Sequence, residues 1–197
     1  MNNIYKSLSK IARSNLDKLF EENFSEEKER LSEKLLANAT LQSVRMENEV
    51  VAMGEEITHV NFLVHGAVWA REDFRTGDKL YFNRFRSPEI FGEMELLAGE
   101  KNYTATLIAE TRCEFIQIPI EDYKTYLVEN PDFLYHRCHL ILKRVLKEQA
   151  LSRMHTVMNA TDRMKALLVY YYEEAYHRYH HDFISVPGTK CTYQFAI

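Results

Sequence analysis

The residues whose types most clearly suggest a chemical role are Gly92 and Glu93, which open a short apolar stretch that ends at Leu97. Glycine lets the main chain approach a ligand closely, and a short helix starting here would point unpaired backbone N–H groups at an anion such as phosphate. The Glu93 carboxylate could accept hydrogen bonds from sugar hydroxyls. The alternative interpretation is a turn in a β-barrel, in which a glycine and an acid only satisfy turn geometry. The elements around the pair must decide between a phosphate cradle and a structural turn.

Composition and charge limit the class of protein. The chain has 197 residues, of which 46% are hydrophobic and 27% charged, so it can bury a core without disulfides. The net charge of −4 means that a DNA-binding surface must be local or absent. Cys113, Cys138 and Cys191 lack C-x-x-C spacing, which indicates a reducing compartment and argues against a disulfide framework, an iron–sulfur cluster or a zinc site.

The location of the protein is inferred from hydropathy. No stretch approaches the roughly 18 consecutive apolar residues that a bilayer-spanning helix needs. The first residues, Met1 to Lys6, lack the apolar core of a signal peptide. We therefore expect a cytoplasmic protein with no membrane partner.

Short strand-like segments separated by turn residues occupy the region from Leu41 to Pro119. Many strands at close, regular intervals favour an antiparallel barrel or jelly roll over alternating strands and helices. The fold class expected is α+β, built on an antiparallel jelly roll, a double-stranded β-helix. The predicted strands are 41–46, 49–52, 60–64, 67–72, 79–86, 103–109 and 113–119.

Helical periodicity flanks this region on both sides. Before it, apolar residues at helical spacing predict two or three amphipathic helices within residues 3–38, one of them capped by Ser25. After it, the last strand is followed by elements of several kinds. They are a helix over 120–128, a long helix over 133–158, a helix from an N-cap at Thr161 or Asp162 to Tyr179, a strand over 183–186, and the start of another helix over 192–197.

The long helix predicted over 133–158 carries two neighbouring apolar stripes. At 1.5 Å per residue it would be about 39 Å long, which exceeds what the core of a small domain usually needs. Such a helix often packs against a second copy of itself, so we expect a homodimer, with packing along its own barrel as the alternative. The residues expected in the dimer interface are Leu134, Cys138, Ile141, Leu142, Val145, Leu146 and Met154.

The order of elements, the segment 91–97 and the joint over 159–164 together resemble the cyclic-AMP receptor protein/FNR (Crp/Fnr) family of bacterial transcription regulators. The resemblance covers nearly the whole chain from Leu41 on. It implies promoter DNA and RNA polymerase as partners of a full-length form, and a helix-turn-helix whose first helix starts near Thr192. The implied domains are N-terminal helices with a cyclic-nucleotide-binding-like jelly roll over 1–130, a dimerisation helix over 131–158, and the beginning of a winged helix-turn-helix over 159–197.

The resemblance also implies a ligand-binding cassette, with one departure. In that family the Gly-Glu pair meets the ribose and cyclic phosphate, an arginine eleven residues after the glycine neutralises the phosphate, and a neighbouring Ser or Thr adds a hydrogen bond. Here the arginine position is Tyr103, while Thr104 keeps the hydroxyl. A buried phosphodiester without a cation is costly, and tyrosine supplies no charge. We expect a small-molecule effector other than cyclic AMP, in a pocket lined by Gly92, Glu93, Met94, Tyr103, Thr104 and, from the long helix, Gln149.

Other classes of function are weighed against this one. A stand-alone ligand-binding or protein-interaction module would lack DNA binding, and coding sequence for a helix-turn-helix after residue 197 would exclude it. An enzyme working as some cupins do would need clustered metal ligands on strands, and His59 and His65 are too few. His177, His180 and His181 lie at a predicted helix end, where cations are favourable, rather than at a metal site. We therefore expect no catalytic residue, no metal and no certain cofactor.

Overall fold

The computed structural model describes residues 3–21, 34–74, 76–179, 183–185 and 192–194. The chain forms two compact units, Met1–Cys138 and His139–Ile197. The three-part division at residues 130 and 158 that the sequence suggested stays a prediction.

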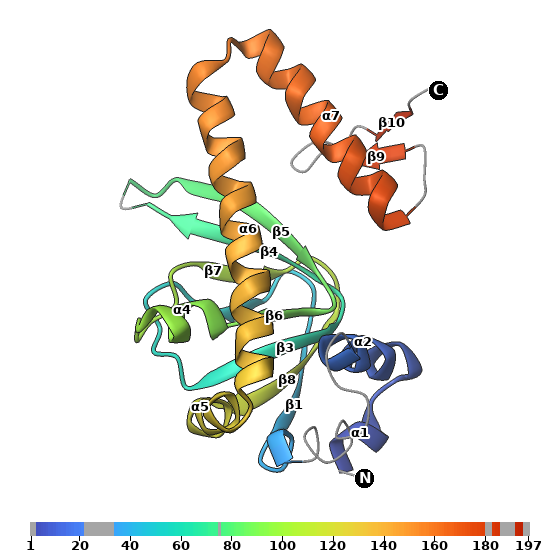
Figure 1. Ribbon diagram of the computed structural model, residues 1–197, viewed down its shortest axis with the longest axis vertical. Helices are drawn as coiled ribbons and strands as arrows, with labels where there is room; N and C mark the ends of the chain where they lie inside the picture. Colours follow the sequence, from blue (N-terminus) through green and yellow to red (C-terminus); the bar gives the residue numbers. More distant parts are fainter. Residues whose placement is uncertain (1–2, 22–33, 75, 180–182, 186–191, 195–197) are drawn as a thin grey trace. The chain divides into compact units, whose positions relative to one another are not determined.

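Two antiparallel four-stranded sheets make up the described strands of the first unit (Figure 1). One sheet has the order β1 (Thr40–Val44), β8 (Cys113–Pro119), β3 (His59–His65) and β6 (Glu89–Phe91). The other has the order β2 (Glu49–Val51), β7 (Thr106–Ala109), β4 (Ala67–Asp73) and β5 (Lys79–Arg86). Strands that are distant in sequence are therefore neighbours in each sheet. This is a jelly roll, and the predicted α+β fold class is confirmed.

Strand β3 is buried on both faces because it separates two apolar clusters. Val60, Phe62 and Val64 belong to the cluster that includes the helices, where the Phe62 ring meets Tyr123 edge-on at 5.9 Å between centroids. Leu63 points the other way, into the cluster between the two sheets. A near-continuous apolar run is what a strand covered on both faces requires.

The described residues form six helices. They are α1 (Asn3–Ser7), α2 (Lys10–Glu21), α4 (Glu93–Ala98), α5 (Ile120–Glu129), α6 (Pro131–Val157) and α7 (Ala160–Tyr179). The long helix predicted over 133–158 corresponds to α6. The predicted N-cap Ser25 lies outside the described residues.

Helix α7 starts earlier than the sequence indicated. Its N-cap is Asn159, whose Oδ1 accepts a hydrogen bond from the backbone N–H of Asp162 at 2.9 Å. The predicted caps, Thr161 and Asp162, are wrong because both residues already lie in the first turn of the helix. All three residue types favour caps, so sequence preference alone could not choose among them.

The end of the described chain also differs from expectation. Residues Thr192–Gln194 form β10, which pairs antiparallel with β9 (Phe183–Ser185), so the prediction of a helix start is wrong for these residues. Residues 195–197 lie outside the described part. A three-residue Thr-Tyr-Gln segment is too short to show a period, and its β-branched and aromatic members suit a strand. The start of a helix-turn-helix is not confirmed.

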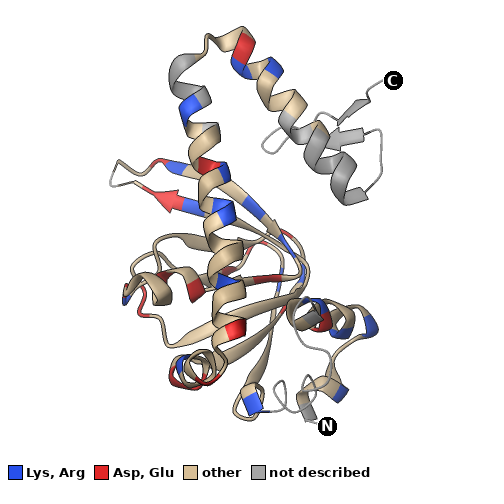
Figure 2. Cartoon of the chain, in the orientation of Figure 1, with Lys and Arg blue, Asp and Glu red and all other residues tan. Residues whose placement is uncertain are grey.

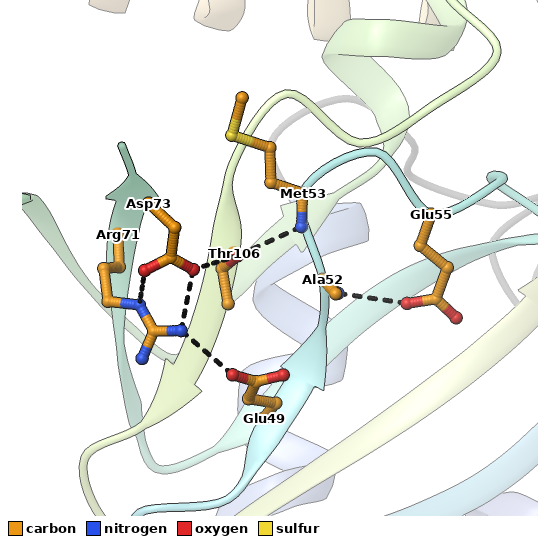
Figure 3. A network of polar contacts seen from close by, with 7 residues as sticks. All are labelled: Glu49, Ala52, Met53, Glu55, Arg71, Asp73 and Thr106. Carbon is orange, nitrogen blue, oxygen red and sulfur yellow. Dashed lines mark hydrogen bonds and ion pairs between the residues drawn. The ribbon is translucent and has the colours of Figure 1, made fainter. Parts of the chain in front are cut away.

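A polar network ties β2, β4 and β7 together (Figure 3). Arg71 of β4 is 7% exposed and forms ion pairs with Glu49 at 2.9 Å and with Asp73 at 2.8 Å. Thr106 of β7 donates to Asp73 at 3.4 Å and accepts a hydrogen bond from the backbone N–H of Met53 at 3.0 Å. Hydrogen bonding to Asp73 raises the pKa of Arg71, while the same contact lowers the pKa of Asp73. The network thereby holds the loop that follows β2 against the second sheet.

Charges of both signs are interspersed along most of the described elements (Figure 2), in keeping with the small net charge of −4. None of the helices in the described ranges combines the length and the apolar character that crossing a bilayer requires.

Candidate ligand-binding cassette

The Gly92–Glu93 pair joins β6 to the short helix α4, and Gly99 ends that helix. Gly92 has φ 83°, a conformation that side chains other than glycine rarely adopt. A Cβ atom added at Gly92 would lie 3.2 Å from the backbone oxygen of His59 and 3.3 Å from Cε1 of Tyr103. Glycine is therefore required both by the backbone conformation and by the close approach of Tyr103.

Tyr103 is bound into the interior of the barrel. It is 6% exposed, and its hydroxyl donates to the backbone oxygen of His59 at 2.9 Å and accepts from Nδ2 of Asn61 at 2.8 Å. Nε2 of Gln117 in turn donates to Oδ1 of Asn61 at 3.0 Å. Burial raises the pKa of Tyr103 to about 12, so the phenol stays neutral. A neutral, fully hydrogen-bonded side chain thus lies against Gly92, where the resemblance implied a cation.

Thr104 is held by an acidic residue of α4. Its Oγ1 donates to Oε1 of Glu95 at 2.7 Å, and its backbone N–H donates to the same oxygen at 3.4 Å. The charge of Glu95 also acts to raise the pKa of Tyr103, which places a carboxylate near that phenol. The hydroxyl that the resemblance assigns to the phosphate therefore donates to a carboxylate in this structure.

Glu93 faces away from solvent. It is 1% exposed. Nε of Arg137 donates to both carboxylate oxygens of Glu93 at 3.0 Å, and Nη2 of Arg137 donates to Oε2 at 2.8 Å. The hydroxyl of Tyr123 donates to Oε1. Burial alone would lower the pKa of Arg137, but the hydrogen bonds and charge of Glu93 raise it above its ordinary value. Burial, together with the charge of Glu93, raises the pKa of Tyr123 well above its ordinary value.

The structure brings some of the predicted pocket residues together and separates others. Gly92 and Tyr103 are in contact, Thr104 follows Tyr103, and Met94 is 40% exposed on α4. Gln149 is exposed on the part of α6 that belongs to the second unit. Ligand binding by Gly92, Glu93, Met94, Tyr103, Thr104 and Gln149 stays a prediction.

Sequence reasoning missed the partners of these residues. Asn61, Gln117, Tyr123 and Arg137 come from β3, β8, α5 and α6, and no motif joins them to the cassette. One signal was present: Arg137 follows the buried Phe133 by four residues and so occupies the apolar face of its helix. A buried arginine needs an acidic partner, but its spacing does not reveal which one.

The predicted dimer interface has a varied environment in the single chain. Leu142 and Leu146 are 59% and 62% exposed, Leu134 packs partly against the core, and the side chain of Met154 lies outside the described residues.

The described residues contain no group of three or more His, Cys, Asp or Glu side chains placed to bind a metal.

Residues 41–130 match the cyclic nucleotide-binding domain family. A global nitrogen regulator from Nostoc sp. (strain PCC 7120) is 29% identical over 99 residues, which are 49% of this chain and 44% of that protein. This part of the chain is therefore similar to cyclic nucleotide-binding domains, and the resemblance of the chain to Crp/Fnr regulators is confirmed.

Solved structures show the same fold. The catabolite activator protein of Thermus thermophilus has a TM-score of 0.56 at 22% identity, covering 68% of this chain and 60% of that one. The c-di-GMP responsive regulator CLP of Xanthomonas campestris has a TM-score of 0.63 at 22% identity, covering 79% and 78%. The sensor domain of the regulator DNR from Pseudomonas aeruginosa has a TM-score of 0.57 at 18% identity, covering 81% and 99%. The chain spans less than two thirds of the Nostoc and Thermus proteins.

Proposed function

We propose that this chain is the effector-sensing and dimerisation part of a Crp/Fnr-type bacterial transcription regulator whose effector is not cyclic AMP. It acts in the cytoplasm as a homodimer and catalyses no reaction. Its full-length form binds promoter DNA and RNA polymerase. The match to the cyclic nucleotide-binding domain and the names of the related proteins support this assignment.

The observation that carries the choice of effector is the place of Tyr103. Its buried neutral phenol lies against Gly92, and the carboxylate of Glu95 holds the adjacent Thr104. A cyclic phosphate bound against Tyr103 would lose its hydration and meet a neutral phenol where an arginine would supply a positive charge, which is unfavourable for a buried anion. A neutral small molecule would avoid that cost.

Signalling follows from the position of the cassette next to the long helix. Occupancy of the pocket would bias two arrangements of a pair of α6 helices, because a ligand shifts an equilibrium by its different affinity for the two states. In the full-length regulator that shift would alter the spacing of two DNA-reading helices.

Calorimetric titration with cyclic AMP tests the effector class. The wild-type chain is expected to show no binding at micromolar concentrations, and a dissociation constant in the micromolar range or below would contradict the proposal. Mass spectrometry of small molecules carried through native purification then identifies the effector itself.

A further inference from the structure

Strand β5 ends the second sheet, and its outer edge pairs with no other described strand. With eight residues it is about 27 Å long at 3.4 Å per residue. A free edge of this length presents a row of backbone N–H and C=O groups to which another strand can bind. We propose that an extended acidic segment of a partner protein adds to β5 as a further strand. Such docking is independent of the proposed effector, since none of the predicted pocket residues lies on β5.

Three consecutive apolar side chains of β5 are left in solvent. Leu80, Tyr81 and Phe82 are 49%, 50% and 53% exposed, although successive side chains of a strand point to opposite faces of a sheet. Phe74, whose backbone N–H donates to the oxygen of Asp78 across the hairpin turn at 2.9 Å, is also exposed. A run of exposed apolar residues is typical of a binding surface and is otherwise a liability. The hairpin therefore offers apolar contacts beside the free edge.

The charge of β5 indicates which kind of segment fits. The strand carries Lys79, Arg84 and Arg86 and no acidic residue, in a chain whose net charge is −4. Lys79 and Arg86 are exposed at the two ends of the strand, whereas Arg84 is paired with Glu110 at 2.6 Å. Two copies of β5 would bring like charges together along one edge, which destabilises cross-strand pairs. Acidic side chains would instead be attracted to Lys79 and Arg86, so the charge favours an acidic segment over a second copy.

The single tryptophan of the chain provides a reporter beside this edge. Trp69 of β4 is the cross-strand neighbour of Arg84. Its ring meets that of Tyr81 edge-on with 6.3 Å between centroids, and Cζ of Arg84 lies 5.8 Å from its ring centroid. A segment that contacts Tyr81 or Arg84 would change the surroundings of Trp69. The fluorescence of Trp69 should therefore report docking at β5.

The probe is an eight-residue peptide of alternating glutamate and valine, blocked at both ends. A lysine–valine peptide reverses its charge, and a glutamate–proline peptide keeps the charge but lacks half of the backbone donors that a strand ladder needs. We expect the glutamate–valine peptide to change Trp69 fluorescence with a dissociation constant below about 1 mM. Both control peptides should bind at least about tenfold more weakly. Hydrogen exchange of the backbone over 79–86 should slow only with the glutamate–valine peptide.

Two charge variants test the position of the site. Lys79→Glu/Arg86→Glu should weaken binding of the glutamate–valine peptide at least about tenfold, because both ends of β5 become acidic. Lys18→Glu/Arg45→Glu is the matched control, since it changes the net charge by the same amount at exposed positions on α2 and after β1. This control should bind the peptide nearly as well as wild type.

An apolar variant tests the exposed side chains. Leu80→Ser/Phe82→Ser should also weaken binding several-fold, because it removes apolar contacts beside the edge. Ile11→Ser is its control, since Ile11 is 61% exposed on α2. Circular dichroism melts establish that each variant is folded, and the three peptides test the wild-type chain whether or not a variant folds.

Four results would overturn strand addition by an acidic segment. One is the absence of saturable binding by the glutamate–valine peptide at millimolar concentration. Equal affinities of the glutamate–proline and glutamate–valine peptides, or equal losses in the two charge variants, would leave only non-specific attraction. A lower mass of Lys79→Glu/Arg86→Glu than of wild type in light scattering would assign the edge to a second copy of the chain.

Discussion

At the scale of single residues, the cassette is determined by how closely Tyr103 approaches Gly92. A Cβ at position 92 would lie 3.3 Å from Cε1 of Tyr103, so a larger residue would force its neighbours to shift. The tyrosine hydroxyl is satisfied by His59 and Asn61. The glycine that first suggested a phosphate cradle thus also accommodates an aromatic ring of the chain itself.

Replacement of Gly92 by alanine should destabilise the protein through both strain and crowding. A positive φ costs an L-residue about 1–2 kcal/mol, and the neighbours of Gly92 must also shift. Gly54→Ala is the control, since Gly54 has the same φ of 83° and nothing within 4 Å of an added Cβ. We expect Gly92→Ala to lower the unfolding free energy by about 1 kcal/mol more than Gly54→Ala in urea titrations. Equal losses would show that the Tyr103 contact does not matter.

Tyr103 should also make stability depend on pH in the alkaline range. Its pKa is raised to about 12 in the folded protein, while an unfolded tyrosine ionises near 10. Its contribution is therefore complete below about pH 10 and is lost as the pH rises towards 12, by about 2–3 kcal/mol. Tyr103→Phe should lose less stability than wild type between pH 9 and pH 11.5 in urea titrations. Tyr123 and Tyr126 are present in both proteins, so only Tyr103 can make their plots of unfolding free energy against pH differ. Parallel plots would therefore contradict the prediction.

At the scale of elements, the buried pair of Glu93 and Arg137 joins α4 to α6, and Tyr123 adds α5. Removing one partner of such a buried ion pair lowers the stability of the folded protein, because it leaves the other charge uncompensated. Removing both partners leaves no such charge and costs less stability. The cluster therefore sets the arrangement of three helices around the cassette within the first unit.

Arg137→Leu should reduce the unfolding free energy by about 3–5 kcal/mol, because Glu93 is left buried and unpaired. Glu93→Leu/Arg137→Leu should recover most of this loss. Lys34→Ala is the comparison for an exposed pair, since Lys34 and its partner Glu129 have side-chain exposures of 63% and 46%, and it should cost about 1 kcal/mol or less. Chemical denaturation monitored by circular dichroism measures all three. A double variant as unstable as Arg137→Leu would rule out an unpaired charge as the cause.

At the scale of the whole molecule, the proposed assembly depends on α6. Leu142 and Leu146 expose most of their apolar side chains in the single chain, and they lie on one face because they are four residues apart. Burying that face against a second copy would remove apolar surface from water, which is the main driving force for association.

Leu142→Glu combined with Leu146→Glu should convert a dimer into a monomer, because like charges would face each other across the interface. Val128→Glu is the control, since Val128 is 79% exposed but lies on α5. Light scattering at tens of micromolar should give twice 23.3 kDa for wild type and control, and 23.3 kDa for the double variant. A wild-type mass of 23.3 kDa would refute the predicted homodimer.

Elements with long, strong patterns can be predicted from the sequence. The turn glycines and short apolar runs predicted the jelly roll, and the extended periodicity predicted α6. Short elements are poorly predicted: the sequence predicts no strand over β6 (Glu89–Phe91) and a helix over β10, because three residues show no reliable period. The resemblance to the Crp/Fnr family also predicted the position of the cassette and a tyrosine, Tyr103, at the arginine position.

The contacts of the cassette residues follow from the packing of distant segments. Tyr103 meets Asn61 across 42 positions of sequence, and Glu93 meets Tyr123 and Arg137 across 30 and 44 positions. Local periodicity carries no information about such pairs, since chain folding and burial select them. The resemblance of the segment 91–97 to the Crp/Fnr family predicted a cassette at Gly92 and Glu93, whereas the side chains that contact these two residues follow from the packing of the sheets and helices.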